Sequence, residues 1–237
     1  MKVKRLFQSQ SQSRVERNLK SGRLDRKALH RIASGAVDVY SKKVSRVSCE
    51  NTVLYLLVDA SGSMSGNRFN CAAAAGALMT EAMLPLKVPV KISAFTERTA
   101  WKGLEAKERL EDYVIKDYAE HRPRAKILED FNKVVPKLHQ NADGDSLMLA
   151  FRDIMARKEK RKILVVLSDG MPCSDREGSA DKFLKHAVKY VESSPVELYA
   201  IGLESRSVEH FYSNFEVLSS TSELEGCLLN LVKSKFI

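Results

Sequence analysis

Residues 52–63 of this chain read TVLYLLVDASGS. The first seven form a continuous apolar, β-rich run, which is typical of a strand buried on both faces in a parallel sheet covered by helices. Three side chains with oxygens follow at alternate positions, Asp59, Ser61 and Ser63, and Gly62 permits the tight turn that carries them. The stretch therefore predicts a buried strand that presents a cluster of oxygens at the edge of a sheet.

Strand and helix patterns alternate from residue 50 onward. We expect further strands at 90–95, 112–115 (short), 162–168, 196–201 and 215–218. We expect helices at 69–83, 124–138, 145–158, 180–192 and 221–233. This alternation implies right-handed crossovers and an α/β fold with a doubly wound, mostly parallel sheet flanked by helices. Binding sites in such sheets lie beyond the carboxyl ends of the strands.

The first 49 residues differ from the rest in charge. They hold 13 Lys or Arg and three acids, a net +10, whereas residues 50–237 carry a net −1. Residues 1–22 have too little apolar surface to offset the entropy of ordering, so we interpret them as a flexible basic arm. Its expected partner is an acidic protein surface or nucleic acid.

Residues 23–49 are predicted to be a helical extension that packs on the main domain, residues 50–237. The prediction depends on apolar residues at near-helical spacing, Leu24, Leu29, Ile32, Ala33 and Val37.

Several classes of protein are disfavoured by what the sequence lacks. No apolar run approaches the roughly 18 residues of a spanning helix, and none follows the basic N-terminus as in a signal peptide, so we expect a cytoplasmic protein without a membrane span. No phosphate-binding loop of the GxxxxGK[ST] form is present, so we expect no ATP hydrolysis by the chain alone and assign no catalytic residue. The four dispersed cysteines are expected to be reduced packing residues: Cys49, Cys71, Cys173 and Cys227.

A metal site is predicted where three loops meet. Asp59 and Ser61 alone could simply cap the next helix. However, a second expected strand ends in Ser168-Asp169-Gly170, and Asp143 precedes a third helix. Ligation by oxygen alone suits a hard cation, Mg²⁺ first, with Mn²⁺ or Ca²⁺ as alternatives.

This order of motifs resembles the von Willebrand factor A (VWA) family with its metal-ion-dependent adhesion site. Asp59, Ser61 and Ser63 match the family's first motif, and Asp169 matches its last. Asp143 aligns with a middle position that is usually Thr. The resemblance implies a metal site of Asp59, Ser61, Ser63, Asp143 and Asp169. Around it, Asp145, Ser168 and Trp101 are candidates for supporting the site or contacting a partner.

Four segments are similar to the C-terminal VWA domain of the cobaltochelatase subunit CobT: Phe95–Gly103, Asn141–Leu149, Arg161–Gly170 and Ser194–Gly202. That branch has an acidic DGE-type segment in place of Thr. The resemblance implies a metal-dependent adaptor that works with an AAA+ ATPase of the MoxR or CobS type. An alternative is a subunit of a cobalt or magnesium chelatase that acts on a tetrapyrrole or corrin in cobalamin biosynthesis together with a large chelatase subunit. A third reading is a binding module tethered to nucleic acid by its basic arm.

Overall fold

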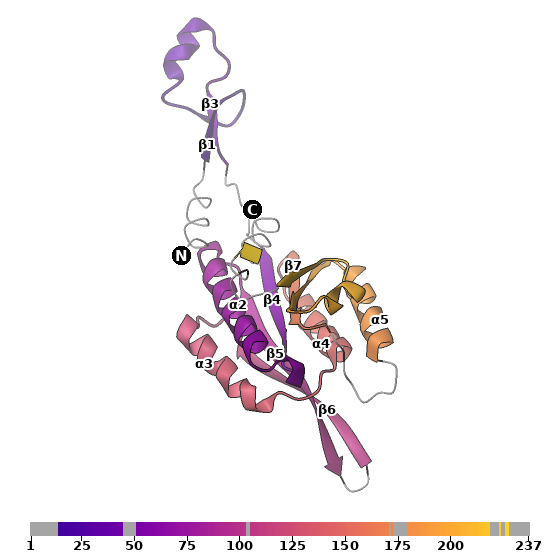
Figure 1. Cartoon of the computed structure of the whole chain (residues 1–237). Helices are drawn as coiled ribbons and strands as arrows, with labels where there is room; N and C mark the ends of the chain where they lie inside the picture. Colours follow the sequence, from indigo (N-terminus) through magenta and orange to yellow (C-terminus); the bar gives the residue numbers. More distant parts are fainter. Residues whose placement is uncertain are drawn as a thin grey trace.

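A computed structural model describes residues 14–44, 51–102, 105–170, 172, 180–218, 223 and 226–227. Its main feature is a six-stranded sheet with the strand order β6-β5-β4-β7-β8-β9 (Figure 1). The strands are β4 (Thr52–Asp59), β5 (Val90–Lys102), β6 (Glu105–Lys116), β7 (Arg161–Ser168), β8 (Val196–Leu203) and β9 (Phe215–Leu218). All neighbours pair in parallel except β5 and β6. The expected doubly wound, mostly parallel sheet is confirmed.

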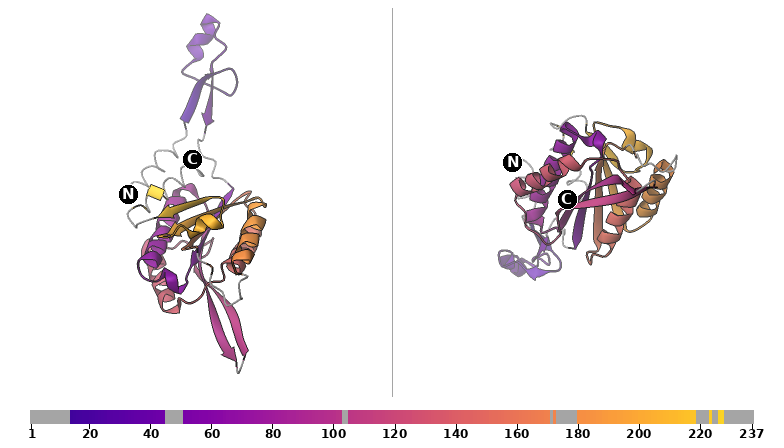
Figure 2. Two further views of the ribbon diagram at one scale, coloured as in Figure 1. Left: turned by 45° about the vertical axis from the view of Figure 1, so that its right-hand side comes forward. Right: turned by 90° about the horizontal axis from the view of Figure 1, so that it is seen from below.

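Helices cover both faces of this sheet (Figures 1 and 2). On one side lie α2 (Asn67–Met83) and α3 (Arg124–Val134), and on the other lie α4 (Asp143–Met155) and α5 (Ala180–Glu192). Alternate residues of β4 supply the two cores: Leu54, Leu56 and Val58 pack with α2 and α3, whereas Val53, Tyr55 and Leu57 pack with α4 and α5.

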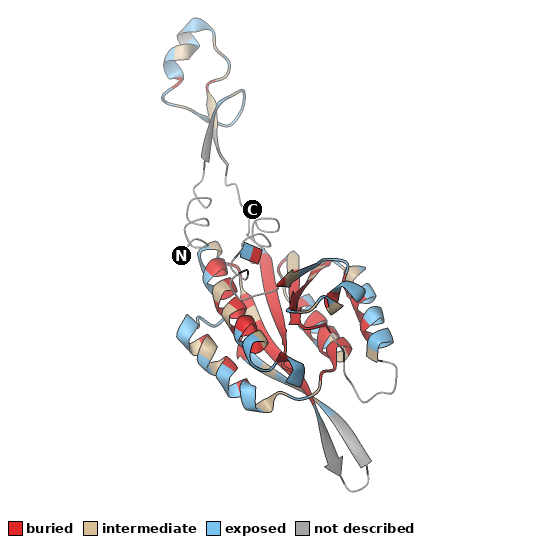
Figure 3. Ribbon diagram, viewed as in Figure 1, coloured by how far each residue is buried: buried red, intermediate tan, exposed pale blue. Residues whose placement is uncertain are grey.

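Strand β4 lies at the centre of the molecule, and all eight of its residues are buried (Figure 3). Because both faces of the strand are covered, its sequence is a continuous apolar run and does not alternate. At Gly76 helix α2 comes so close that an added Cβ would lie 3.4 Å from the Leu56 side chain. Helix α2 therefore packs tightly against the middle of β4.

Strands β5 and β6 run further than the sequence predicted. Asp59, the last residue of β4, pairs with Phe95, but β5 continues to Lys102. Over this part it pairs with β6 and, at Glu97, forms a single bridge to Gln140. The two strands project from the carboxyl edge of the sheet as a hairpin (Figures 1 and 2). Thr96 and Glu97 are still buried, but from Arg98 and Arg109 outward the described side chains are exposed and charged, so the apolar signal of a strand is lost.

The expected helical extension at 23–49 is wrong for most of the residues described there. Residues 14–44 form a three-stranded antiparallel sheet of β1 (Arg14–Leu19), β2 (Arg23–Leu24) and β3 (Tyr40–Val44), and the only helix is the short 3₁₀ segment η1 (Leu29–Ser34). Gly35, with φ +80°, ends that helix. Figure 1 shows this small sheet standing apart from the large one.

The apolar spacing at 23–37 misled because these side chains do not form a core-facing stripe. Leu24, Leu29, Ile32 and Val37 are each 40–68% exposed. The flexible arm predicted for 1–22 is also wrong in part, since Arg14–Leu19 is a strand; residues 1–13 and 45–49 lie outside the described part.

The remaining helices agree with the sequence except at their ends. Helix α3 stops at Val134 and a 3₁₀ turn, η4 (Val135–Lys137), follows, because Pro136 has no amide hydrogen for the next α-helical bond. Most of the helix expected at 221–233 lies outside the described residues. One described segment, Asn67–Leu86, has the length and hydropathy of a spanning helix, but 56% of it is buried inside the fold, as expected of a core helix.

Candidate metal centre

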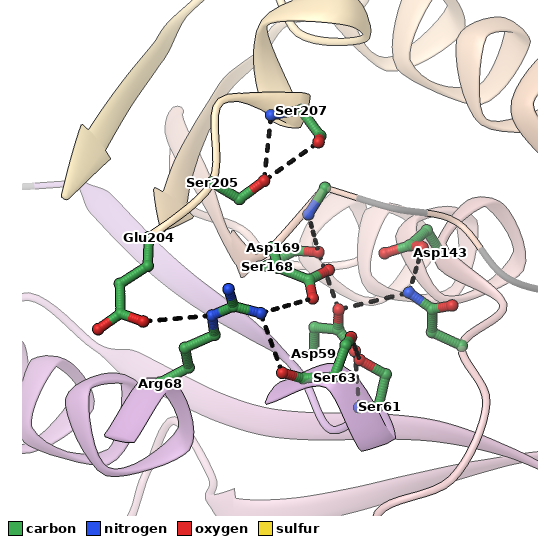
Figure 4. A network of polar contacts seen from close by, with 12 residues as sticks. Asp59, Ser61, Ser63, Arg68, Asp143, Ser168, Asp169, Glu204, Ser205 and Ser207 are labelled. Atoms are coloured by element: carbon green, nitrogen blue, oxygen red, sulfur yellow. Dashed lines mark hydrogen bonds and ion pairs between the residues drawn. The ribbon is translucent and has the colours of Figure 1, made fainter. Parts of the chain in front are cut away.

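The predicted site residues converge at the carboxyl edge of the sheet (Figure 4). Asp59 ends β4 and Asp169 directly follows β7, two neighbouring parallel strands whose residues Val58 and Leu167 are paired. Asp143 is the first residue of α4. All three carboxylates are buried, with exposures of 0% for Asp59, 4% for Asp143 and 2% for Asp169. The structure thus brings together three acids that are up to 110 residues apart in sequence.

Asp59 is held in place by hydrogen bonds to both oxygens. Its Oδ1 accepts from the Ser61 amide at 2.8 Å, and its Oδ2 accepts from the Ser168 hydroxyl at 2.8 Å. Ser168 is fixed in turn, because its Oγ accepts from the Gly170 amide at 2.9 Å. Ser168, which the sequence placed near the site, therefore supports Asp59.

The two serines of the first motif lie together. Their hydroxyl oxygens are 3.0 Å apart, with Ser61 buried and Ser63 exposed. They lie at and within the short 3₁₀ helix η2 (Gly62–Met64), which Ser61 precedes as N-cap residue. The backbone oxygen of His139 accepts from the Gly62 amide at 2.5 Å and ties this turn to the segment before α4.

Asn141 links two of the carboxylates, and the sequence did not single it out. Its Nδ2 donates to Asp143 Oδ2 at 2.8 Å and to Asp59 Oδ2 at 3.4 Å, and its side chain is buried. Its position is set by Gln140, which pairs with the base of the hairpin through backbone bonds to Glu97 of 2.7 and 3.1 Å. The signal available in the sequence was an amide two residues before Asp143.

Burial and mutual repulsion disfavour the charged forms of these acids. The pKa of Asp59 is raised to about 6, first by desolvation and then by the charge of Asp169. The pKa of Asp143 is raised well above its ordinary value by burial and by the charges of Asp59 and Asp169. A divalent cation among these oxygens would offset both effects.

One cation already lies at this edge, and the sequence missed it. The Nη1 atom of Arg68, on α2, donates to the Ser63 backbone oxygen at 3.1 Å and lies 3.5 Å from Asp169 Oδ2. Its Nε lies 3.4 Å from Glu204 Oε2 (Figure 4). Arg68 thus connects Asp169 to the loop after β8. A lone arginine in the sequence carries no signal of such a contact.

The backbone geometry directly after Asp169 requires a glycine, Gly170. Its φ is +74°, and a Cβ placed there would lie 2.5 Å from the Val208 amide nitrogen. The chain therefore turns sharply after Asp169 against the loop at 207–208, a conformation and a space that only glycine accommodates.

The donor set fits a hard cation. Among the described residues, no three Asp, Glu, His or Cys side chains are grouped to hold a metal by themselves. The hydroxyls of Ser61 and Ser63 would have to complete the set with Asp59, Asp143 and Asp169. An all-oxygen set of this kind suits Mg²⁺, Mn²⁺ or Ca²⁺ over softer metals.

Asp145 and Trp101, which the sequence analysis also placed near the metal site, lie in other surroundings. Asp145, in the first turn of α4, borders a cavity of about 350 Å³ beside Glu97 and Arg152. Trp101 is in β5 on the projecting hairpin, paired with Ala106, and its side chain lies outside the described part. Of the four cysteines, Cys71 and Cys227 are free and buried as expected, whereas Cys49 and Cys173 lie outside the described residues.

Solved structures share this fold at low identity. The pilus adhesin SpaC from Lactobacillus rhamnosus GG matches with a TM-score of 0.57 and 12% identity over 79% of this chain and 30% of that one. The vWF domain of the type V pili tip protein Mfa5 from Porphyromonas gingivalis matches with a TM-score of 0.57 and 10% identity, over 78% and 96%. The PilB minor pilin from Streptococcus sanguinis, in a variant form, has a TM-score of 0.58 and 10% identity, over 82% and 64%. The chain spans less than half the length of SpaC. At 10–12% identity, these likenesses show the fold alone.

A family model described as the VWA domain of the cobalamin biosynthesis protein CobT matches residues 39–116 and 114–236. The match covers most of the chain, including β4, which ends in Asp59, and β7, which Asp169 follows. The chain therefore belongs to the family of the CobT VWA domain.

Proposed function

We propose that this protein is a metal-dependent interaction module that binds an AAA+ ATPase of the MoxR or CobS type. The observation that carries the proposal is the set of three buried carboxylates, Asp59, Asp143 and Asp169, gathered with two serine hydroxyls at one edge of the sheet. Buried acids that repel one another cost stability unless a cation or a proton joins them. A cluster of this kind destabilises the fold when it is empty, so it is better suited to binding a cation than to stabilising the fold.

The chain's own residues prepare the site for a partner. Ser168 and Asn141 fix Asp59, Asn141 also fixes Asp143, and Arg68 contacts Asp169 from α2. A bound Mg²⁺ would supply a Lewis-acidic position that accepts a carboxylate oxygen of the partner. Ser63 is exposed beside the buried Ser61, so the side of the site formed by the first motif faces outward.

The hairpin of β5 and β6 extends from the same edge of the sheet as the site. A partner that reaches the metal edge would also meet this ribbon. ATP-driven partners act where ATP is present, so a cytoplasmic location is part of the proposal.

Metal binding is tested first, by calorimetric titration of Mg²⁺ into the metal-free protein. We expect binding by the wild type and loss of most of it in Asp59→Asn, because the substitution removes a charge that is central to the set. Asp181→Asn, an exposed residue on α5, is the matched control and should bind like the wild type. Equal affinity in all three proteins would rule out the proposed metal centre.

Partner binding is tested second, by capture from native lysate with the same three proteins, with and without Mg²⁺. We expect an AAA+ ATPase, identified by mass spectrometry, to be retained by the wild type and Asp181→Asn only when Mg²⁺ is present. Retention of the same ATPase by Asp59→Asn, or in the presence of EDTA, would show that the interaction does not use the metal.

The family description favours a second function, that of a subunit in a chelatase that inserts cobalt or magnesium into a tetrapyrrole. In that role the chain acts inside a complex with the ATPase and a large subunit, and the metal centre joins the subunits. Cobalt insertion that requires this chain and fails with Asp59→Asn would support it. An assembled complex that inserts cobalt equally well without the chain would contradict it.

A further inference from the structure

A cavity lies at the other end of the sheet from the metal centre. It measures about 680 Å³ and opens between the end of α2 with η3 (Leu84–Leu86) and the segment 117–123 that leads into α3. Val90, which begins β5, and Lys116, which ends β6, are in its wall. Cavities of this size hold small organic ligands.

Lys116 contributes a buried positive charge to this cavity. Only 4% of the residue is exposed, and its ammonium donates to the backbone oxygens of Val90 at 2.7 Å and Asp117 at 2.9 Å. An ammonium has three hydrogens, so one remains beyond these two bonds. No carboxylate of the described residues lies within ion-pairing distance of it. Burial lowers the pKa of Lys116, and the charges of Glu120 and Asp117 offset this effect only in part.

A β-bulge turns Lys116 inward. The pairing of β5 with β6 shifts between Ile92, opposite Lys116, and Ser93, opposite Val114, so Ile115 is an extra residue. As a result, Ile115 and Lys116 are both buried although they are consecutive, whereas successive residues of a regular strand face opposite sides. Bulges that re-aim a side chain in this way occur often beside binding sites.

Apolar surface predominates over the rest of the wall, although Glu81, Lys87, Glu120, His121 and Arg124 also line the cavity. Leu84, Pro85 and Val88 line one side, and Leu84 is 56% exposed at the rim. Arg122, although it lines the cavity, is paired with Glu120 and Asp130 and has little charge to offer a ligand.

The start of α3 adds to the positive potential. Its N-cap residue, Pro123, makes no side-chain capping bond, and its first turn contains no acid. The partial positive charge of the helix start is therefore not offset by a side chain of the helix itself. The acids in the wall, Glu120 and Glu81, are paired with Arg122 and Arg124. Lys116 and the helix start therefore remain as the positive groups that favour a negative charge at this end of the cavity.

We propose that this cavity binds a small amphiphilic carboxylate, with its carboxylate at the ammonium of Lys116 and its apolar body against Leu84, Pro85 and Val88. One buried ammonium with one remaining hydrogen matches a single negative charge. A phosphate, with more charge and more acceptor oxygens, would need several donors. The site is separate from the metal centre and does not depend on the function proposed above.

The test is calorimetric titration of the protein with decanoate and, in parallel, with decanol. Decanol has the same apolar chain without the charge. Lys116→Met removes the ammonium and keeps a similar volume, and Lys87→Met removes an exposed lysine at the rim as the matched control. Because Lys116→Met leaves two carbonyls without their donor, Leu84→Trp is included to fill the cavity from its rim without altering Lys116.

We expect decanoate to bind at least about tenfold more tightly than decanol, and Lys116→Met to lose about tenfold or more of that affinity, the usual worth of a charged hydrogen bond. Leu84→Trp should lose binding, and Lys87→Met and Asp59→Asn should bind like the wild type. The proposal is overturned if decanoate does not bind, if decanol binds equally well, or if Leu84→Trp leaves decanoate affinity unchanged. Loss of decanoate binding in Asp59→Asn would place the ligand at the metal edge instead, which also overturns it.

Discussion

Asp59 combines complete burial with a negative charge, and both its oxygens accept hydrogen bonds from neighbouring residues. Those bonds favour the ionised form, but desolvation and the charge of Asp169 outweigh them and raise the pKa to about 6. The metal-free protein is therefore less stable at neutral pH than the packing around Asp59 would allow.

The raised pKa predicts a pH-dependent gain in stability for Asp59→Asn. A group whose pKa is higher in the folded state than in the unfolded state stabilises the fold below its unfolded value, and this contribution is lost as pH rises through the folded value. In EDTA, Asp59→Asn should match the wild type near pH 4 and exceed its free energy of unfolding by roughly 3 kcal/mol at pH 7.5. Urea unfolding at both pH values measures this, and a difference that does not change with pH would contradict it.

Arg68 shares Asp169 with any bound metal, so its guanidinium competes with the cation. We expect Arg68→Ala to tighten Mn²⁺ binding by about three- to tenfold, because the site becomes more negative, and electrostatic effects between partly exposed groups amount to about 1 kcal/mol. Titration followed by electron paramagnetic resonance of free Mn²⁺ measures the affinity.

Arg124→Ala is the matched control for Arg68, since it removes the same charge from the opposite edge of the sheet. It should leave Mn²⁺ affinity within about twofold of the wild type, because surface charges beyond about 10 Å are largely screened at ordinary salt. Weaker binding in Arg68→Ala would mean that Arg68 helps to hold the site in shape.

Among the elements, the turn that follows β7 depends on Gly170. Its positive φ and the 2.5 Å approach of a Cβ to the Val208 amide predict two separate penalties for a larger residue. Gly66 isolates one of them, because its φ is +80° and nothing lies within 4 Å of its Cβ position.

We expect Gly66→Ala to lower the free energy of unfolding by about 1 to 2 kcal/mol through backbone strain alone. Gly170→Ala should cost at least about 2 kcal/mol more, because the loop at 207–208 must move. Chemical denaturation of both variants measures the difference. Equal losses would show that the loop yields without cost.

For the molecule as a whole, metal binding should be linked to the stability of the large domain only. The small sheet of residues 14–44 has its own hydrogen-bonded strands and stands apart from the six-stranded sheet. At Mg²⁺ concentrations about 100-fold above the dissociation constant, binding should add about 2.7 kcal/mol to the free energy of unfolding of the large domain.

Removal of residues 1–44 should leave this Mg²⁺-dependent gain unchanged to within about 0.5 kcal/mol, because distant sites without shared contacts act additively. Thermal unfolding with Mg²⁺ and with EDTA, for both chain lengths, measures it. A smaller gain in the shortened chain would show that the N-terminal residues contribute to the metal-bound state.

The sequence by itself determined the parallel sheet, because strands buried on both faces are apolar almost throughout, and β4 and β7 stand out on that ground. It also determined that Asp59, Ser61, Ser63 and Asp169 meet, since parallel strands end at one edge. The ends of elements were predicted less well. Helix α3 ends at Val134 because of the local position of Pro136, and β5 continues past Phe95 because its pairing with β6 continues.

The other residues of the site, the N-terminal strands and the orientation of Lys116 were decided only by the tertiary structure. Arg68, Asn141 and Glu204 join the site through contacts with residues distant in sequence, and a single polar residue has no periodicity to reveal such contacts. The N-terminal strands and the inward turn of Lys116 were hidden for a related reason: strand pairing and a bulge depend on the partner strand, so apolar spacing at 23–37 suggested a helix where a small sheet forms.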